Sequence, residues 1–144
     1  MLFQAENYCL FSAMKGTLTF EGKLAVGAKV VRKIGVIGVN KQEEPDFVIT
    51  DEAGRFSFAT INRKIRQQFM EGFFISQDVF VLYQGQEYQI WHLSKGGGRE
   101  YEEFGGRHVN VRCEIKDELV EVEIESGILW TSCVWDFIDK KVLK

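Results

Sequence analysis

The chain has 144 residues, of which 45% are hydrophobic and 27% charged, and its formal net charge at pH 7 is −3. This length fits one domain over residues 1–144, and the balance of apolar and charged residues is that of a folded globular protein. The small negative charge gives no electrostatic reason to bind nucleic acid or an anionic membrane. No stretch is long and apolar enough to span a bilayer as a helix, so we expect neither a nucleic-acid nor a membrane partner.

Three cysteines, Cys9, Cys113 and Cys133, give an odd number with no C-x-x-C spacing. The simplest interpretation is three reduced and mostly buried thiols in a reducing compartment. A single disulfide is the alternative, if the protein is exported. The N-terminal residues lack the basic segment of an export signal, so the sequence predicts a cytoplasmic protein.

The first half of the chain predicts short strands separated by turns. After an apolar segment, apolar and polar residues alternate in stretches bounded by glycines and charge clusters, which predicts strands at residues 16–21, 27–34, 45–50 and 55–60. Between the last two, Asp51 is placed to hydrogen-bond its own downstream backbone, and Gly54 to supply the positive φ of a short hairpin connection. Phe56 and Phe58 then share one face of the following strand.

These stretches resemble the carboxypeptidase regulatory-like (transthyretin-like, prealbumin-type) β-sandwich. That family carries a glycine-framed strand pair and then a Thr-Asp-x-x-Gly-x-Phe-x-Phe hairpin, matched here by Gly16, Leu18, Gly22, Gly27, Ala28, Val30, Thr50, Asp51, Gly54, Phe56 and Phe58. Leu24 replaces the proline that is usual in the family. The resemblance implies a fold and not a chemistry. The C-terminal Tyr-Arg-Gly-Ser motif of the urate-pathway hydrolases with this fold is absent, and so is the tyrosine and histidine spacing of the intradiol dioxygenases.

After residue 61 the pattern changes. Asn62 is a residue type that caps helices, and Ile65 and Phe69, four apart, would share one helical face. We therefore expect at most one short helix, over residues 62–69.

The second half predicts more strands and one long loop. Strands are expected at residues 73–83, 87–93, 109–113, 120–124 and 128–135, which brings the total to about eight or nine in an antiparallel β-sandwich. Residues 94–106 contain five glycines and several charges, and a loop of this kind in a compact domain is usually a binding loop or disordered.

Catalytic and metal-binding patterns are weak. His92 and His108 have no further ligand at metal-site spacing except Cys113, and the alternation of apolar residues places Cys113 on a buried face, where a thiol is inert. We therefore expect a protein that is not an enzyme and that needs no cofactor and no metal.

Two groups of residues predict a surface that binds another protein. The long loop carries tyrosine, arginine and phenylalanine, which the cores of interfaces favour, and the strand at 120–124 alternates apolar residues with glutamates. The predicted contact residues are Lys95, Arg99, Tyr101, Glu102, Phe104, Arg107, Glu121, Glu123 and Glu125.

A looser likeness is to small bacterial proteins with this sandwich, a tryptophan-containing strand and a late cysteine, here Trp91 and Cys113. It suggests an immunity or accessory protein for a cognate secreted toxin. The alternatives are a carbohydrate-type ligand-binding module, which requires Trp91, Trp130 or Trp135 to be exposed, and, ranked lower, a metal-dependent enzyme. The sequence does not give the oligomeric state.

Overall fold

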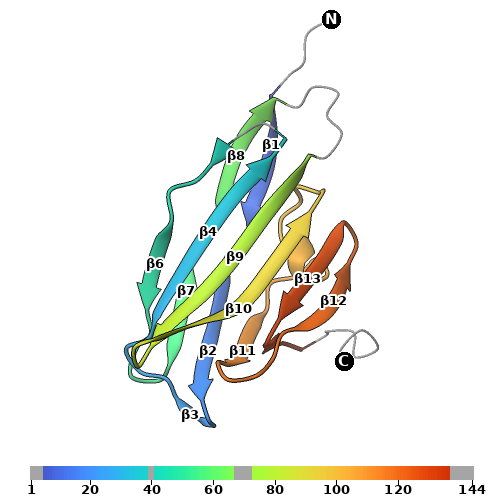
Figure 1. Cartoon of the computed structure of the whole chain (residues 1–144). Helices are drawn as coiled ribbons and strands as arrows, with labels where there is room; N and C mark the ends of the chain where they lie inside the picture. Colours follow the sequence, from blue (N-terminus) through green and yellow to red (C-terminus); the bar gives the residue numbers. More distant parts are fainter. Residues whose placement is uncertain (1–4, 39–40, 67–72, 137–144) are drawn as a thin grey trace, which may run out of the picture.

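The computed structural model describes residues 5–38, 41–66 and 73–136, and the strands in these ranges form two sheets packed face to face and a two-stranded third sheet (Figure 1). The larger sheet has seven strands. Their order is β12 (Val120–Ile124), β13 (Gly127–Thr131), β10 (Gln86–Lys95), β9 (Phe74–Tyr83), β4 (Lys29–Ile37) and β5 (Lys41–Gln42), with β6 (Asp46–Ile49) also paired to β4.

The second sheet has five strands, and the third has two. The five-stranded sheet runs in the order β14 (Cys133–Val134), β11 (Asn110–Glu114), β2 (Met14–Phe20) and β3 (Lys23–Leu24), with β7 (Arg55–Phe58) paired to β2. The third sheet pairs β1 (Ala5–Phe11) with β8 (Ile61–Arg66). Neighbouring strands are antiparallel throughout the described residues, except that β2 and β11 run parallel. One 3₁₀ turn, η1 (Glu102–Phe104), follows β10.

The core lies between the two larger sheets and follows from the alternation of side chains along the strands. In β9, the residues that alternate with the more exposed Ser76, Asp78 and Phe80 are buried, among them the aliphatic Ile75, Val79 and Val81. They belong to one hydrophobic cluster with Leu18 of β2 and Val111 of β11. Two sheets that share one core in this way make the all-β sandwich that the sequence predicted.

Tight turns with positive φ close two hairpins. Glu21 and Gly22 have φ values of 52° and 82° between the paired strands β2 and β3. Gln84 and Gly85 have φ values of 51° and 77° between β9 and β10. Positive φ at both central residues is the geometry of the tight turns that join antiparallel strands.

Glu114 fastens the first of these turns to β11. Its carboxylate accepts hydrogen bonds from the backbone N–H groups of Glu21, Gly22 and Lys116 at 3.0, 2.8 and 2.9 Å, and from the Thr19 hydroxyl at 3.0 Å. Partial burial raises the pKa of Glu114, but these hydrogen bonds to the charged form outweigh it, and the net result is a lowered pKa.

The segment at residues 50–58 has the predicted turn chemistry but a different role. Asp51 Oδ1 accepts hydrogen bonds at 2.9 Å from the N–H groups of Ala53 and Arg55, and Gly54 has φ 72°. The hydrogen bond from the Arg55 N–H is the main cause of the lowered pKa of Asp51. The two flanking strands are not paired, because β6 belongs to the larger sheet and β7 to the smaller one. The turn therefore carries the chain between sheets and does not close a hairpin.

The short helix expected over residues 62–69 is wrong for the part that the structure describes. Residues 61–66 form β8, which pairs antiparallel with β1. A spacing of four residues, as between Ile61 and Ile65, is even, so it places both side chains on one face of a strand as well as of a helix. Pairing with β1 decided the outcome. Phe69 lies outside the described residues.

The cysteines also depart from expectation. Cys113 of β11 and Cys133 of β14 lie directly opposite each other with Cα atoms 4.1 Å apart and form a disulfide, so the prediction of three reduced thiols is wrong. A separation of 20 residues carries no signal for this pair, which only the pairing of β11 with β14 brings together. Cys9 keeps a free, buried thiol, and burial raises its pKa.

Candidate functional site

The long loop after β10 is anchored by a buried cluster of charged side chains. Lys95, with no exposed side-chain surface, places its Nζ 3.2 Å from Glu102 Oε1 and 3.6 Å from Glu103 Oε2. The same ammonium group donates a hydrogen bond to the Cys9 carbonyl at 3.1 Å. Buried charges persist in folded proteins only when they are paired and hydrogen-bonded, and these three meet that condition.

Glu103 connects the loop to the core. Its carboxylate accepts hydrogen bonds from the Ser12 N–H at 3.0 Å, the Ser12 hydroxyl at 2.7 Å and the Gln77 amide at 2.9 Å. Gln77 in turn accepts a hydrogen bond of 2.9 Å from the indole N–H of the buried Trp91. The chain of contacts thus runs from the loop, through β9, to the centre of β10.

Glu102 connects the loop to the turn after β12. Its carboxylate accepts hydrogen bonds from the Ser126 hydroxyl at 2.5 Å and from the Arg99 N–H at 3.1 Å. The partly buried hydrogen bond from Ser126 therefore holds the 3₁₀ turn against the β12–β13 hairpin.

The glycine run of this loop serves close packing. A Cβ atom added at Gly97 would lie 2.5 Å from Glu102 Oε2, and one added at Gly98 would overlap the ring of Tyr8. A Cβ added at Gly96 would meet its nearest neighbour, the Ser126 carbonyl, at an ordinary 3.7 Å. The sequence left open whether this loop is a binding loop or disordered, and the structure packs it closely against Glu102 at Gly97 and against Tyr8 at Gly98.

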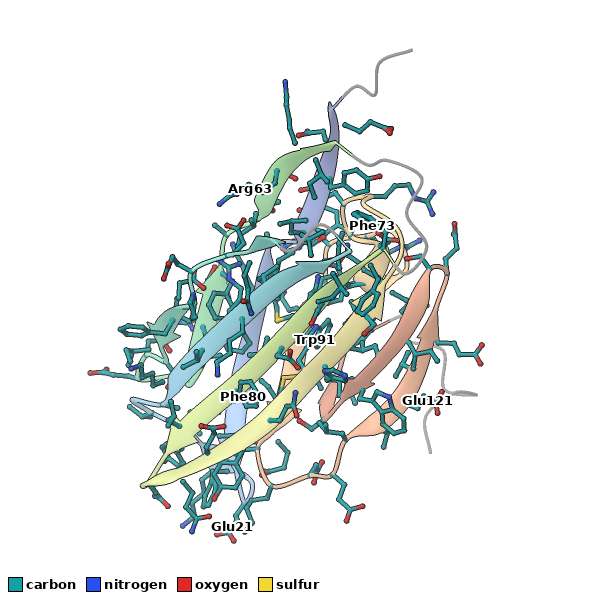
Figure 2. The ribbon with its side chains drawn as sticks, turned by 45° about the horizontal axis from the view of Figure 1, so that its top comes forward. Glu21, Arg63, Phe73, Phe80, Trp91 and Glu121 are labelled. Atoms are coloured by element: carbon teal, nitrogen blue, oxygen red, sulfur yellow. A yellow bond between two sulfur atoms is a disulfide. The ribbon has the colours of Figure 1, made fainter. Side chains whose placement is uncertain are left out.

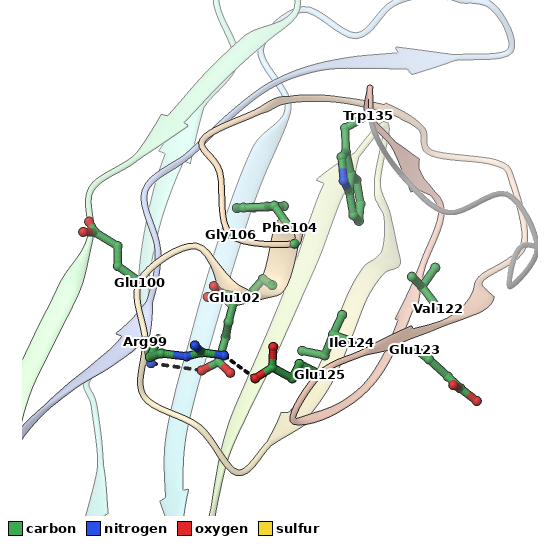
Figure 3. Close-up of a pocket in the computed structure, with 12 residues that line it drawn as sticks. Arg99, Glu100, Glu102, Phe104, Gly106, Val122, Glu123, Ile124, Glu125 and Trp135 are labelled. Carbon is green, nitrogen blue, oxygen red and sulfur yellow. Dashed lines mark hydrogen bonds and ion pairs between the residues drawn. The ribbon is translucent and has the colours of Figure 1, made fainter.

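A groove of about 520 Å³ lies between η1 and β12 (Figure 3). One wall is formed by the loop and the other by consecutive residues of β12 and the turn after it. Its lining residues are Arg99, Glu100, Glu102, Glu103, Phe104, Gly105, Gly106, Val122, Glu123, Ile124, Glu125 and Trp135.

Phe104 and Trp135 form an apolar base of this groove, and Trp91 packs against both of them. Phe104 and Trp135 pack edge to face with ring centroids 5.4 Å apart, and Trp91 lies 5.7 Å from the first and 6.1 Å from the second. All three side chains are buried. Such edge-to-face and tilted pairs are favourable arrangements for aromatic rings, so the base of the groove is firmly packed.

The groove is acidic. Glu100, Glu102, Glu103, Glu123 and Glu125 line it, and Arg99 is the one basic residue among its lining residues. Arg99 forms an ion pair with Glu125 at the exposed mouth of the groove. Several carboxylates around a concave surface focus a negative potential, which attracts a cationic group from solution.

The structure brings together most of the predicted contact residues but leaves several of them inaccessible. Lys95, Glu102 and Phe104 are buried, because the charged cluster and the aromatic base use them internally, so the prediction that they form a contact surface is corrected. Tyr101 is half-buried and stacks edge to face on His108 with centroids 5.7 Å apart. The predicted contact residues that remain exposed are Arg99, Arg107, Glu123 and Glu125, with Glu121 half-buried at the sheet edge (Figure 2).

The predicted contact residues leave out seven of the twelve residues that line the groove: Glu100, Glu103, Gly105, Gly106, Val122, Ile124 and Trp135. The alternation at 120–124 did indicate that Ile124 faces inward. No sequence signal placed Trp135 beside Phe104, since the two meet only through the packing of η1 on the end of β14.

The two histidines have separate surroundings. His92 Nδ1 lies 2.6 Å from Asp78 Oδ1, and His108 contacts Tyr101. Within the described ranges, no group of three or more histidine, cysteine, aspartate or glutamate side chains has the arrangement needed to hold a metal ion.

The tryptophans differ in exposure. Trp91 and Trp135 are buried, whereas Trp130 of β13 is 41% exposed on the outer face of the larger sheet. Its neighbours across the strands are His92 of β10 and Glu121 of β12.

The fold and the groove define an all-β sandwich-like domain with a firmly packed acidic groove at one end of its larger sheet. A family model described as a domain of unknown function, DUF6795, matches residues 14–118, and the chain belongs to this family. The match includes the loop wall of the groove and ends before β12, which forms the other wall. No curated protein and no solved structure matches the chain. In the described part of the chain, no helix has the length and apolar character required to cross a bilayer.

Proposed function

We propose that this protein is a non-enzymatic binding domain that attaches to a basic surface of another protein through the groove between η1 and β12. The observation that carries the proposal is that glutamates from two distant segments line one concave surface, and three of them, Glu100, Glu123 and Glu125, are exposed. Charge complementarity of this kind speeds association and favours partners whose surface is positively charged.

The construction of the groove supports a binding role. Its loop wall is fixed by the buried contacts of Lys95, Glu102 and Glu103, and its base by packed aromatic rings. A surface that is already ordered loses little conformational entropy when a partner binds, which leaves more of the contact energy available for affinity.

The narrower form of the proposal is an immunity or accessory protein that binds a cognate bacterial toxin. The looser sequence resemblance suggests this role. The sequence also predicted a cytoplasmic location. The Cys113–Cys133 disulfide favours an oxidising compartment instead, because disulfides are rare where thiol reductants are abundant. Alkylation of free thiols in freshly lysed and unfolded cell protein, followed by mass measurement, decides between a reducing and an oxidising compartment. If the disulfide is present only Cys9 reacts, and if it is absent all three cysteines react.

Affinity capture with matched charge variants tests the binding role. The tagged protein is compared with Glu123→Lys/Glu125→Lys, which reverses the charge at the groove, and with Glu52→Lys/Glu87→Lys, which makes the same change at exposed sites elsewhere. Glu87 lies at the opposite end of β10 from the groove. A stoichiometric partner that is retained by the control and lost by the groove variant supports the proposal. Equal capture by all three proteins refutes the groove as the binding surface.

A carbohydrate-type binding module is a second candidate, favoured by one observation. Trp130 is exposed on the outer face of the sheet beside the hydrogen-bonded pair of His92 and Asp78, and an exposed aromatic ring with polar neighbours suits the apolar face of a sugar. Soluble polysaccharides should then change the tryptophan fluorescence of the wild type and leave that of Trp130→Ala unchanged. An unaltered wild-type spectrum removes this candidate.

A further inference from the structure

β12 is the last strand of the larger sheet. Among the described residues it pairs only with β13, and its other edge faces the groove (Figure 3). An edge strand presents backbone N–H and C=O groups that another extended chain can pair with.

The backbone hydrogen bonds of the neighbouring strands show which residues face the open edge. The Gly96 N–H donates to the Ser126 carbonyl at 2.8 Å, and the Ser132 N–H donates to the Ile90 carbonyl at 3.2 Å. In an antiparallel ladder, bonds at these positions direct the backbone groups of Gly127, Leu129 and Thr131 away from β10 and toward β12. Their partners across the hairpin are Ile124, Val122 and Val120.

By alternation, the two remaining residues of β12 direct their backbone groups to the open edge. These residues are Glu121 and Glu123, so the groups available for a further strand belong to the two acidic positions. The side chains of Glu121 and Glu123 lie on the outer face of the sheet, while Val122 and Ile124 face inward, Val122 buried and Ile124 half-buried. The inward side is continuous with the base formed by Phe104 and Trp135.

We propose that an extended segment of the partner protein adds to β12 as a further strand of the larger sheet, with alternating basic and aliphatic side chains. This inference rests on the proposed function and states the chemistry of the partner. Basic side chains lie opposite Glu121 and Glu123, and aliphatic ones extend the inward face of Val122 and Ile124 over the aromatic base. Strand addition obtains affinity from main-chain hydrogen bonds and selectivity from alternate side chains.

The charge of β12 argues against a second copy of this chain as the occupant. Two β12 strands paired edge to edge would place glutamates opposite glutamates, and like charges directly opposite each other destabilise strand pairing. A basic segment meets the same positions with opposite charge.

The test uses a synthetic peptide of about seven residues that alternates lysine with valine, which is long enough to cover the five residues of β12. Binding to the ¹⁵N-labelled full-length protein is followed by the exchange rates of its backbone amides. The amides of Glu121 and Glu123 should slow by about tenfold or more at saturation. Those of Val122 and Ile124, which already face β13, should change little and serve as the internal control.

Backbone methylation of the peptide gives an independent readout. One peptide carries a methyl group on the backbone nitrogen of every lysine, and the other on the backbone nitrogen of every valine. Each set of methyl groups blocks the backbone N–H groups on one side of the strand only, because successive N–H groups point in opposite directions. Strand addition predicts that one methylated peptide loses binding by about tenfold or more while the other retains it. Equal binding by both, or no change in any amide at about 1 mM peptide, overturns the inference.

The outcomes also separate this inference from the proposed function. If the captured partner or the lysine peptide loses affinity for Glu123→Lys/Glu125→Lys but neither methylation matters, the acidic groove binds side chains only. The strand-addition inference then fails and the proposed function stands. A dimer in light scattering that the peptide dissociates identifies a second copy as the occupant and overturns the inference. If groove charge reversal changes no binding at all, both fail.

Discussion

Replacing Lys95 by methionine tests whether the buried charged cluster holds the loop in place. Methionine keeps a long, flexible side chain of similar shape but removes the ammonium group, so the change leaves little empty volume. Glu102 and Glu103, with side chains 4% and 2% exposed, then lose their common cation and remain buried. The Cys9 carbonyl loses its hydrogen bond from the same nitrogen.

Breaking a buried ion pair by removing one partner typically costs about 3–5 kcal/mol of the free energy of unfolding. A domain of this size has about 5–15 kcal/mol in total. The variant should therefore lose a large share of its free energy of unfolding. With a urea dependence of about 2 kcal/mol per molar, the midpoint should fall by about 2 M.

Urea unfolding followed by tryptophan fluorescence measures this directly, because Trp91 is hydrogen-bonded to Gln77, which contacts Glu103. Lys23→Met, at an exposed lysine of β3, is the matched control and should change the free energy of unfolding by less than about 0.5 kcal/mol. Adding Glu102→Gln to Lys95→Met should recover at least about 1 kcal/mol, since it removes one unpaired carboxylate. A cost below about 1 kcal/mol for Lys95→Met would refute the view that this cluster fixes the groove wall.

Three further predictions concern other parts of the fold. The lowered pKa of Glu114 means that its contribution to the free energy of unfolding is complete above the unfolded-state pKa and is lost as the pH falls through the lower folded-state value, so Glu114→Gln should flatten the loss of stability below about pH 5 in urea titrations. Reducing the Cys113–Cys133 disulfide should lower the free energy of unfolding by about 3 kcal/mol, measured with and without reductant, and an unchanged urea midpoint would contradict its structural role. Gly98→Ala should destabilise the protein by at least about 1 kcal/mol in thermal unfolding, whereas Gly96→Ala should be nearly neutral; equal effects would show that close approach does not explain the glycine run.

The all-β sandwich could be predicted because the signals for it are local. Alternating burial requires only neighbours two residues apart, and the tight turns require only residues that tolerate positive φ, as at Gly22 and Gly85. Where a local pattern fits two structures, prediction failed. The four-residue spacing of Ile65 and Phe69, on which the helix was predicted, also suits one face of a strand, and for residues 61–66 only the pairing with β1 decided for the strand.

The candidate site was predicted in part. The acidic positions of β12 follow from alternation, and the sequence correctly placed Glu123 and Glu125 at the surface. It could not show that Lys95 and Glu102 are buried, because charged residues in a glycine-rich stretch ordinarily face water. Burial of these groups depends on Ser12, Gln77 and Ser126, which come from other strands and turns and supply their hydrogen bonds.

The sequence by itself determined most of the strands and the faces of them that are buried, since these depend on the order of residues over a few neighbouring positions. Tertiary structure alone decided the disulfide between Cys113 and Cys133, the anchoring of the glycine-rich loop and the meeting of that loop with β12. These features join residues that are far apart in the chain. Their contact energies exist only after the two sheets have packed, so no local pattern encodes them.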